Sequence, residues 1–193
     1  MKIGYITLID PTTHAAKQEK IGVELERIIA SIFSQPSQFV PVHVANDRKQ
    51  LRAALIRLCD DEKCPLVLTL GGTGPGPDDI APDVTLEVAD RKLPGFGEIM
   101  RYYSYERFKV SVLSRAEAGV RGRSLIINLP GRPKPVKFCL RLLREGIAEA
   151  LDQITGVRPT LRDDEVVVPL EKYLPFLKWL RTKPDPRGEH PSL

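Results

Sequence analysis

The sequence contains few of the residues that mark secreted or metal-stapled proteins. Only 3 of its 193 residues are cysteine, and an odd number without a secretion signal argues against a disulfide framework. No histidine or second cysteine pair stands near Cys59 and Cys64, which disfavours a zinc site. We expect these two cysteines and Cys139 to be buried as small apolar side chains.

Long apolar runs are also absent. No window holds the roughly 18 consecutive apolar residues that cross a bilayer, so no membrane partner is expected. The start, MKIGYITLID, lacks the longer apolar region and the small-residue cleavage site of a secretory signal. Together these observations predict a protein that stays in the cytoplasm.

The chain also carries little net charge. The formal net charge is +4, which is too small to indicate a nucleic-acid partner. Basic residues nevertheless gather between positions 115 and 144, and such a cluster can attract an anionic small molecule. For Arg141 and Arg144 the ordinary solvated face of a helix is the favoured interpretation.

What the sequence does contain is a regular alternation of patterns. Continuous apolar runs, typical of strands covered on both faces, alternate with segments whose apolar residues recur at helical spacing. Because parallel neighbours need crossover connections, this order predicts an α/β fold with a mainly parallel sheet. Pro41 indicates an edge or strand-start position. The predicted strands are 3–9, 39–44, 65–70 and 125–130, and the predicted helices are 19–33, 47–59, 82–91, 96–105 and 134–154.

The composition changes after Gly156. We predict one domain over residues 1–156 and a C-terminal extension over residues 157–193. The extension is expected to be partly disordered, because its end is polar and rich in proline. Within it, VVVP at 166–169 is a candidate edge strand, and Trp179 is expected to pack the tail on the body or on a partner subunit.

A glycine-rich loop follows the apolar strand at 65–70. Its residues GGTG, at 71–74, permit positive φ and let backbone N–H groups approach an anion. Ligands of open α/β sheets bind outside the carboxyl ends of the strands, so the loop is a candidate phosphate or nucleotide site. No Gly-Lys-Ser/Thr follows it, which excludes a P-loop, and a tight structural turn remains an equal alternative.

Acidic side chains accompany this loop. Asp79 follows it, and Asp47 follows the strand at 39–44, which should end at the same edge of the sheet. Two carboxylates there could hold Mg²⁺, which prefers one or two carboxylates plus phosphate oxygens and waters. The ion would neutralise charge on a leaving pyrophosphate. Alternatively, both aspartates merely cap helices.

Two further segments add cationic and hydroxyl groups. In NLPGRPK, residues 128–134, Pro-Gly forces a turn ahead of a helix whose free N–H groups suit an anion. The basic residues of that segment, Lys134 among them, add positive charge. In LSRAEAGVRG, residues 113–122, Ser114 and Arg115 lie on an expected loop that could reach the same edge.

Taken together, these segments resemble the molybdopterin-binding family. The likeness is to the molybdopterin adenylyltransferases of bacteria and plants and to the G domain of gephyrin, and it covers roughly residues 2–155. The order GGTG…D…PD.T…PGFGE.MR…LSR…NLPG.PK is highly specific. It is carried by LVLTLGGTG (66–74), DIAPDVTLEVADRKLPGFGEIMR (79–101), LSRAEAGVRGRSLIINLPGRPK (113–134) and the helix containing KFCLRLL.

The resemblance implies a three-layer α/β/α sandwich, a homotrimer, and an enzyme that uses Mg²⁺ and ATP. Such an enzyme adenylylates the phosphate of molybdopterin, a dithiolene pterin, and releases pyrophosphate; hand-over to a molybdenum-insertion protein would follow. By resemblance, Asp47 and Asp79 are the catalytic, metal-binding residues. The implied nucleotide-binding residues are Gly71, Gly72, Thr73 and Gly74, and the implied substrate-binding residues are Ser114, Arg115, Asn128, Pro130, Gly131 and Lys134.

Two departures from the family pattern bear on activity. The early Ser-Asp-Arg of the family is Ile9-Asp10-Pro11 here, and an arginine that commonly precedes the second aspartate is Asp78. The latter exchange puts an anion where a cation would face a phosphate, which predicts weaker phosphate binding or altered metal occupancy. The alternative function is a non-catalytic protein that binds or delivers molybdopterin; a purely structural scaffold has no specific support.

Overall fold

The computed structural model describes residues 1–9 and 15–162. Its strands are β1 (Lys2–Ile9), β2 (Gln38–Ala45), β3 (Leu66–Leu70), β4 (Arg91–Lys92), β5 (Ala118–Arg121) and β6 (Ser124–Leu129). Its helices are α1 (Ala15–Ile32), α2 (Arg48–Ile56), η1 (Arg57–Asp61), α3 (Ala81–Val88), α4 (Pro94–Tyr105), η2 (Lys109–Leu113) and α5 (Pro133–Thr155). None of these helices is long and apolar enough to cross a bilayer. Asp10, Pro11, the candidate strand at 166–169 and Trp179 lie outside the described residues.

The sheet is mostly parallel, as the alternating pattern predicts. Its strands take the order β2-β1-β3-β6-β5-β4. β1, β2, β3 and β6 run parallel, and β5 and β4 extend the sheet in antiparallel fashion. β2 is an edge strand, which confirms the edge position that Pro41 indicated, because proline cannot donate to a central ladder. The four parallel strands end together at one edge, at Ile9, Ala45, Leu70 and Leu129.

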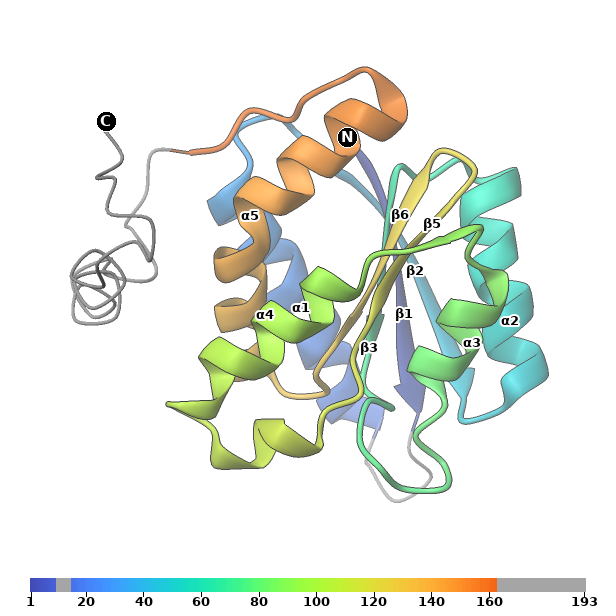
Figure 1. The fold of residues 1–193 in the computed structure, drawn as a ribbon. Coiled ribbons are helices and arrows are strands. Elements are labelled where there is room, and N and C mark those ends of the chain that lie inside the picture. Colours follow the sequence, from blue (N-terminus) through green and yellow to red (C-terminus); the bar gives the residue numbers. More distant parts are fainter. Residues whose placement is uncertain (10–14, 163–193) are drawn as a thin grey trace, which may run out of the picture. The chain divides into compact units, whose positions relative to one another are not determined.

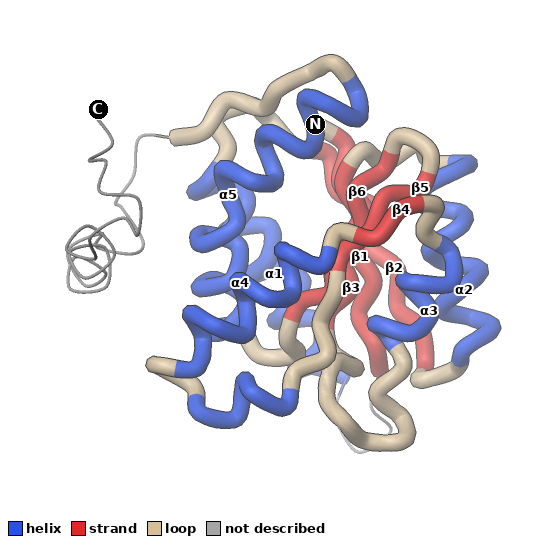
Figure 2. Tube along the Cα trace, in the orientation of Figure 1, coloured by secondary structure: helices blue, strands red, loops and turns tan. Residues whose placement is uncertain are grey.

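Helices cover both faces of the sheet and complete the three-layer α/β/α sandwich (Figure 1). The side chains of β1 show why the strand is apolar throughout. Ile3 and Tyr5 pack with α1, α4 and α5, whereas Ile6 and Leu8 pack with α2 and α3, since successive side chains of a strand point to opposite faces. Figure 2 shows the strands as a central layer between the two groups of helices.

The middle of the chain differs from the prediction in several places, and β4 and η2 were not predicted. The segment 113–122, predicted to be a loop, contains β5, which joins β6 through a tight turn at Gly122-Arg123. A strand of four residues is too short to show a reliable period. The helix predicted to reach residue 59 ends as an α-helix at Ile56 and continues as the π-helical turn η1.

The chain turns back on the domain after α5. The helix ends at Gly156, whose φ of 76° is left-handed and therefore suits glycine. The Ser34 N–H then donates to Thr160 O (2.9 Å), and the Arg162 N–H donates to Ile32 O (2.8 Å). The first residues after Gly156 thus pack along the end of α1.

Candidate functional site

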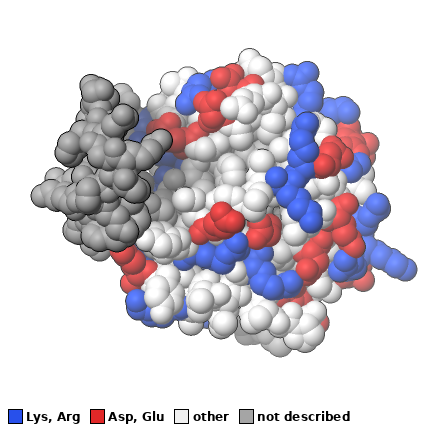
Figure 3. All heavy atoms as spheres, in the orientation of Figure 1, with Lys and Arg blue, Asp and Glu red and all other residues white. Residues whose placement is uncertain are grey.

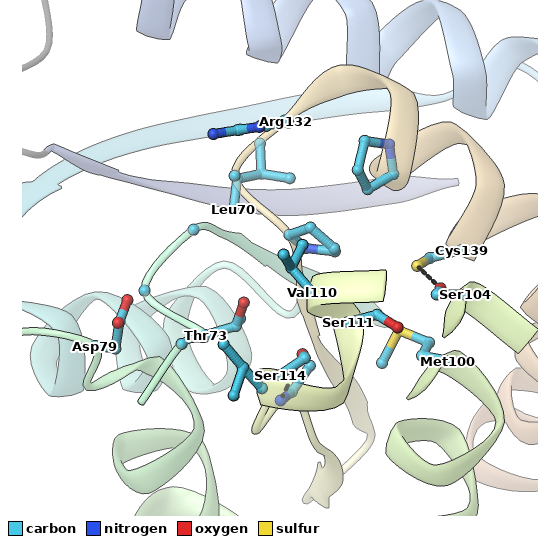
Figure 4. A pocket seen from close by; sticks show the side chains of 18 of the residues that line it. Leu70, Thr73, Asp79, Met100, Ser104, Val110, Ser111, Ser114, Arg132 and Cys139 are labelled. Carbon is cyan, nitrogen blue, oxygen red and sulfur yellow. Dashed lines mark hydrogen bonds between the residues drawn. The ribbon is translucent and has the colours of Figure 1, made fainter. Parts of the chain in front are cut away.

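A pocket of about 770 Å³ lies at the edge where the four parallel strands end. Residues at or just after the ends of β1, β2, β3 and β6 line it, together with residues of α4, η2 and α5. Figure 4 shows Asp79 at one end of this pocket and Met100, Ser104 and Cys139 grouped at the other. Ligands of open α/β sheets bind outside such strand ends, so this pocket is the candidate site.

The predicted glycine loop, residues 71–74, lines the pocket throughout. Gly71 and Gly72 have positive φ angles of 94° and 62°, which glycine adopts at little cost. The Gly71 N–H donates to Leu129 O (3.0 Å), and the Ala81 N–H donates to Gly72 O (3.1 Å). These bonds attach the loop to β6 and α3, so the loop meets the requirements of a tight turn; its anion-binding role stays a prediction.

Asp79 lines the pocket beside this loop. The Gly76 N–H donates to Asp79 Oδ2 (3.0 Å), and a Cβ on Gly74 would lie 2.6 Å from the same oxygen. Glycine at position 74 therefore leaves room for the carboxylate. The alternative that Asp79 caps a helix is wrong, because the N-cap of α3 is Ile80 and has no side-chain cap bond.

Arg115 does not line the pocket itself but bonds to two residues that do, Gly74 and Asp79; its predicted substrate contact stays a prediction. Its guanidinium donates to Gly74 O (Nε, 2.9 Å), to the Asp79 carbonyl, and to both carboxylate oxygens of Asp83 (3.0 Å each). We call this set of bonds the Arg115 clamp. The guanidinium also holds the pKa of the Asp83 carboxyl below its ordinary value. The clamp joins the glycine loop, Asp79 and α3 into one unit.

Asn128 is likewise a structural residue rather than a pocket residue. Its side chain is fully buried. Nδ2 donates to Thr69 Oγ1 (2.9 Å) and Thr85 Oγ1 (2.7 Å), and Oδ1 accepts from the Glu117 N–H (3.2 Å). These bonds connect β3, α3 and the segment before β5; the predicted substrate contact of Asn128 stays a prediction.

The turn after β6 contributes part of the predicted set. Pro130 and Gly131 line the pocket, and a Cβ on Gly131 would lie 3.3 Å from Gly71 Cα, so the two strand-end loops pass closely. Arg132, the N-cap of α5, also lines the pocket. Lys134 does not line it and is exposed; its predicted substrate contact stays a prediction.

Much of the basic cluster that the sequence shows between 115 and 144 is engaged in ion pairs. Arg115 pairs with Asp83, and Arg121 pairs with Asp60 at 2.6 Å. Basic and acidic groups are intermixed over the face seen in Figure 3. Arg132, which lines the pocket, is therefore the best candidate cation for binding an anionic ligand there.

Asp47 caps α2, as the sequence predicts. Its Oδ1 accepts from the Gln50 N–H (2.8 Å). It lies at the same edge of the sheet as Asp79, since β2 and β3 are both parallel to β1. The pocket lining includes its neighbour Asn46 but not Asp47 itself. The capping interpretation of Asp47 is thus confirmed, and a catalytic role would add to it.

Ser114 lines the pocket. Apolar side chains form another wall of the pocket, which the sequence did not predict. This wall comes from α4, η2 and α5, and its buried end carries Ser104 and Cys139, whose Oγ and Sγ atoms are 3.9 Å apart. Burial raises the pKa of the Cys139 thiol to about 11. Helical periodicity marks these side chains only as core. The wall residues are Met100, Phe108, Val110, Leu113 and Pro135.

Four polar residues of the pocket were also missed: Thr7, Asn46, Arg101 and Ser111. Thr7 lies inside the apolar run of β1 and Asn46 follows β2, and both line the pocket. For Thr7, the only signal in the sequence is a threonine within the apolar run IGYITLI. Among residues 1–9 and 15–162, no group of three His, Cys, Asp or Glu side chains could hold a metal ion.

The chain is similar to proteins of molybdenum-cofactor synthesis. Residues 34–150 match a family model described as a probable molybdopterin binding domain. A molybdopterin adenylyltransferase of Helicobacter pylori is 38% identical over 154 residues, which are 80% of this chain and 88% of the relative. One from Escherichia coli is 37% identical over 150 residues, 78% and 75% of the two chains.

Solved structures agree with these matches. The molybdopterin biosynthesis enzyme MoaB of Thermus thermophilus has a TM-score of 0.73 at 32% identity, covering 82% of this chain and 99% of that one. The molybdopterin biosynthesis Mog protein of Mycobacterium ulcerans has a TM-score of 0.67 at 30% identity, covering 80% and 99%. Both the sequence and the fold of this chain therefore match over most of its length.

Proposed function

This chain belongs to the molybdopterin-binding domain family, and from this premise we propose that it is a molybdopterin adenylyltransferase of molybdenum-cofactor synthesis. A phosphate oxygen of molybdopterin attacks the α-phosphorus of ATP. A new P–O bond forms, the bond to the β-phosphate oxygen breaks, and pyrophosphate leaves. The observation that carries the proposal is the glycine loop and the Asp79 carboxylate lining one strand-end pocket, in a chain 37–38% identical to relatives named for this activity.

The residues of the pocket suit two anionic substrates. Backbone N–H groups of residues 71–74 approach phosphate oxygens closely because glycine places no side chain in the way. The N-terminus of α5, with Arg132 at its cap, adds positive potential for a second phosphate. Ser114 supplies a hydroxyl. Holding both phosphates in one pocket supplies the positioning on which phosphoryl-type transfer depends.

Magnesium is the proposed metal, and two carboxylates at one edge of the sheet support it. Asp79 brings a carboxylate into the pocket, and Asp47 brings another to the same edge of the sheet. Few carboxylates combined with substrate phosphate oxygens are what this ion prefers. When bound, the ion supplies neutralisation of charge on the leaving pyrophosphate. The residues that would hold it are Asp47 and Asp79.

The proposal also includes a location, a partner protein and an oligomeric state. We propose a cytoplasmic location, because the reaction consumes ATP, and a hand-over of the adenylylated product to a molybdenum-insertion protein.

We also propose a homotrimer, supported by exposed apolar side chains on α4 and η2, among them Tyr102 and Val112, which subunit contacts would cover. Light scattering should then give three times the 21.6 kDa chain mass; a monomer would contradict this part.

Asp79→Asn tests the proposal most locally, because it removes the charge and keeps the shape. We expect kcat for adenylylated pterin to fall about 10²-fold or more, the scale of losing a group that stabilises transition-state charge. Asp78→Asn is the matched control: Asp78 is exposed and is absent from the pocket lining, so its product formation should be no lower than that of the wild type. Undiminished product with Asp79→Asn, at an unchanged Tm, would count against this mechanism.

A further inference from the structure

Two buried polar atoms on the pocket wall lack partners. Thr7 Oγ1 and Asn46 Oδ1 make no hydrogen bond within the part of the chain that the structure describes, and both residues line the pocket. Thr7 is only 3% exposed, so contact with bulk water does not replace a partner. Buried polar groups in folded proteins are almost always paired. A ligand in the pocket would supply the missing partners.

On the neighbouring strand β3, the hydroxyl of a buried threonine is hydrogen-bonded within the protein. Thr69 of β3 lies one residue before Leu70, the register partner of Thr7. Its hydroxyl accepts from Asn128 Nδ2 (2.9 Å), and the hydroxyl of Thr85 accepts from the same amide (2.7 Å). Among the buried threonines of the described chain, the one that lines the pocket is the one left unpaired. The fold can satisfy a threonine hydroxyl and does so away from the pocket.

The chemistry of the two atoms restricts the ligand group that meets them. An amide Oδ1 only accepts hydrogen bonds, whereas a hydroxyl donates or accepts. Phosphate oxygens at neutral pH are acceptors, so they do not satisfy Asn46 Oδ1. An N–H or O–H group of a heterocycle or a sugar does. The ligand must therefore present a donor at this place.

The position of the atoms agrees with that requirement. Thr7 and Asn46 belong to β1 and to the segment after β2, whereas the glycine loop and Arg132 follow β3 and β6. In the strand order β2-β1-β3-β6, the glycine loop and Arg132 occupy one half of the edge, and the two unpaired atoms occupy the other half, next to Asp47. A substrate with a phosphate at one end and a ring or sugar at the other spans both halves.

We propose that Thr7 and Asn46 form a subsite that holds the uncharged ring or sugar of a bound substrate through its N–H or O–H groups. This inference rests on the proposed adenylyl transfer, in which molybdopterin and ATP both carry such groups. The subsite orients the substrate so that its phosphate end lies at the glycine loop.

Thr7→Val tests the proposal, because it removes the hydroxyl and keeps the branched shape. Calorimetry measures the affinity of the full chain for molybdopterin and for ATP separately, each with Mg²⁺ and with EDTA. We expect about a tenfold loss for one of the two ligands, the scale of one hydrogen bond. The Tm without ligand should stay unchanged or rise, because an unpaired buried hydroxyl is removed.

Thr69→Val is the matched control, with the same substitution on the adjacent strand. It should lower the Tm, since it breaks the bond to Asn128, and leave both affinities unchanged. Asn46→Ala should weaken the same ligand as Thr7→Val. The double variant should lose less than the sum of the two, as expected for groups that share one partner.

The outcomes separate the possibilities. A loss confined to molybdopterin or to ATP supports the subsite and identifies which substrate occupies it. Three results would overturn it: no loss for either ligand, an equal loss for both with a lower Tm, or a loss seen only with Mg²⁺, which would indicate a metal contact. If the wild-type chain binds neither ligand, the proposed function itself is wrong.

Discussion

At the scale of single residues, the Arg115 guanidinium binds three residues of the site that precede it by 32 to 41 positions in the sequence. It bonds to Gly74 O, the Asp79 carbonyl and both oxygens of Asp83. The side chains of Arg115 and Asp83 are 41% and 42% exposed, so their ion pair contributes only about 0–1 kcal/mol to stability. The effect of the clamp is therefore geometric: it fixes where the glycine loop and Asp79 stand.

Arg115→Lys should lower activity far more than stability. Lysine keeps the charge but cannot form the planar, several-fold contact, so the loop and Asp79 shift relative to each other. We expect kcat/KM for adenylyl transfer to fall about 10²-fold, which a misplacement of about 1 Å can cause. The Tm should change little.

Arg121→Lys provides the control for that prediction. Arg121 makes an equivalent bidentate pair with Asp60 and also donates to Val88 O (2.9 Å). Neither of these partners lines the pocket, whereas Gly74 and Asp79, which Arg115 contacts, both do. Its substitution should leave kcat/KM near the wild-type value. Equal losses of activity in the two variants would show that the Arg115 clamp has no particular role in the site.

At the scale of elements, the start of α2 combines two requirements in one side chain. Asp47 satisfies an unpaired N–H of the first helical turn through Oδ1, and its carboxylate lies at the strand-end edge where Asp79 also lies. A cap requires only an oxygen acceptor of suitable length, whereas magnesium binding favours a carboxylate. The two roles can therefore be separated by substitution.

Asp47→Ala should lower the free energy of unfolding by about 1 kcal/mol through loss of the cap, and Asp47→Ser should restore it. If the carboxylate acts in the reaction, both variants should lose about 10²-fold in kcat. Chemical denaturation and product formation measure the two effects separately. An Asp47→Ser variant with wild-type kcat would reduce Asp47 to a helix cap.

At the scale of the whole molecule, three buried thiols make stability sensitive to alkaline pH. Burial raises the pKa of Cys59, Cys64 and Cys139 from 9.0 to about 11. Below pH 9 the thiols are neutral in both states and the full stability is present. As the pH rises from 9 to 11, the unfolded chain loses these protons and the folded chain does not, so the folded state loses stability.

We expect denaturant unfolding to show lower stability at pH 10.5 than at pH 8. Each thiol contributes a slope of at most about 1.4 kcal/mol per pH unit in this window. Cys64→Ala should be less stable at both pH values because of the cavity, yet it should lose less stability between them. The same loss in the wild type and in Cys64→Ala would contradict the assignment.

The fold could be predicted from the sequence where strands are long and covered on both faces. IGYITLI and PLVLTL have no polar face, which predicts a central sheet between helical layers. β4, β5 and η2 escaped prediction because segments of two to five residues show no reliable period. Their formation depends on pairing with β6 and packing against α4, which the local sequence does not show.

The site could be predicted only where its residues act locally. The glycine loop and Asp79 follow one strand, so spacing alone places them together. The structural roles of Arg115 and Asn128 depend on Asp83 and Thr69, 32 and 59 residues away. An arginine or asparagine beside a ligand site looks the same in sequence whether it contacts the ligand or holds the framework.

The most direct test of the account follows the phosphorus atoms of ATP. The wild-type chain is incubated with molybdopterin, Mg²⁺ and ATP labelled either at the α- or at the γ-phosphate, and the pterin and pyrophosphate are separated. Adenylyl transfer predicts α-label in the pterin product and γ-label in pyrophosphate. Label in the pterin from the γ-position, or no labelled pterin at all, would contradict the central claim.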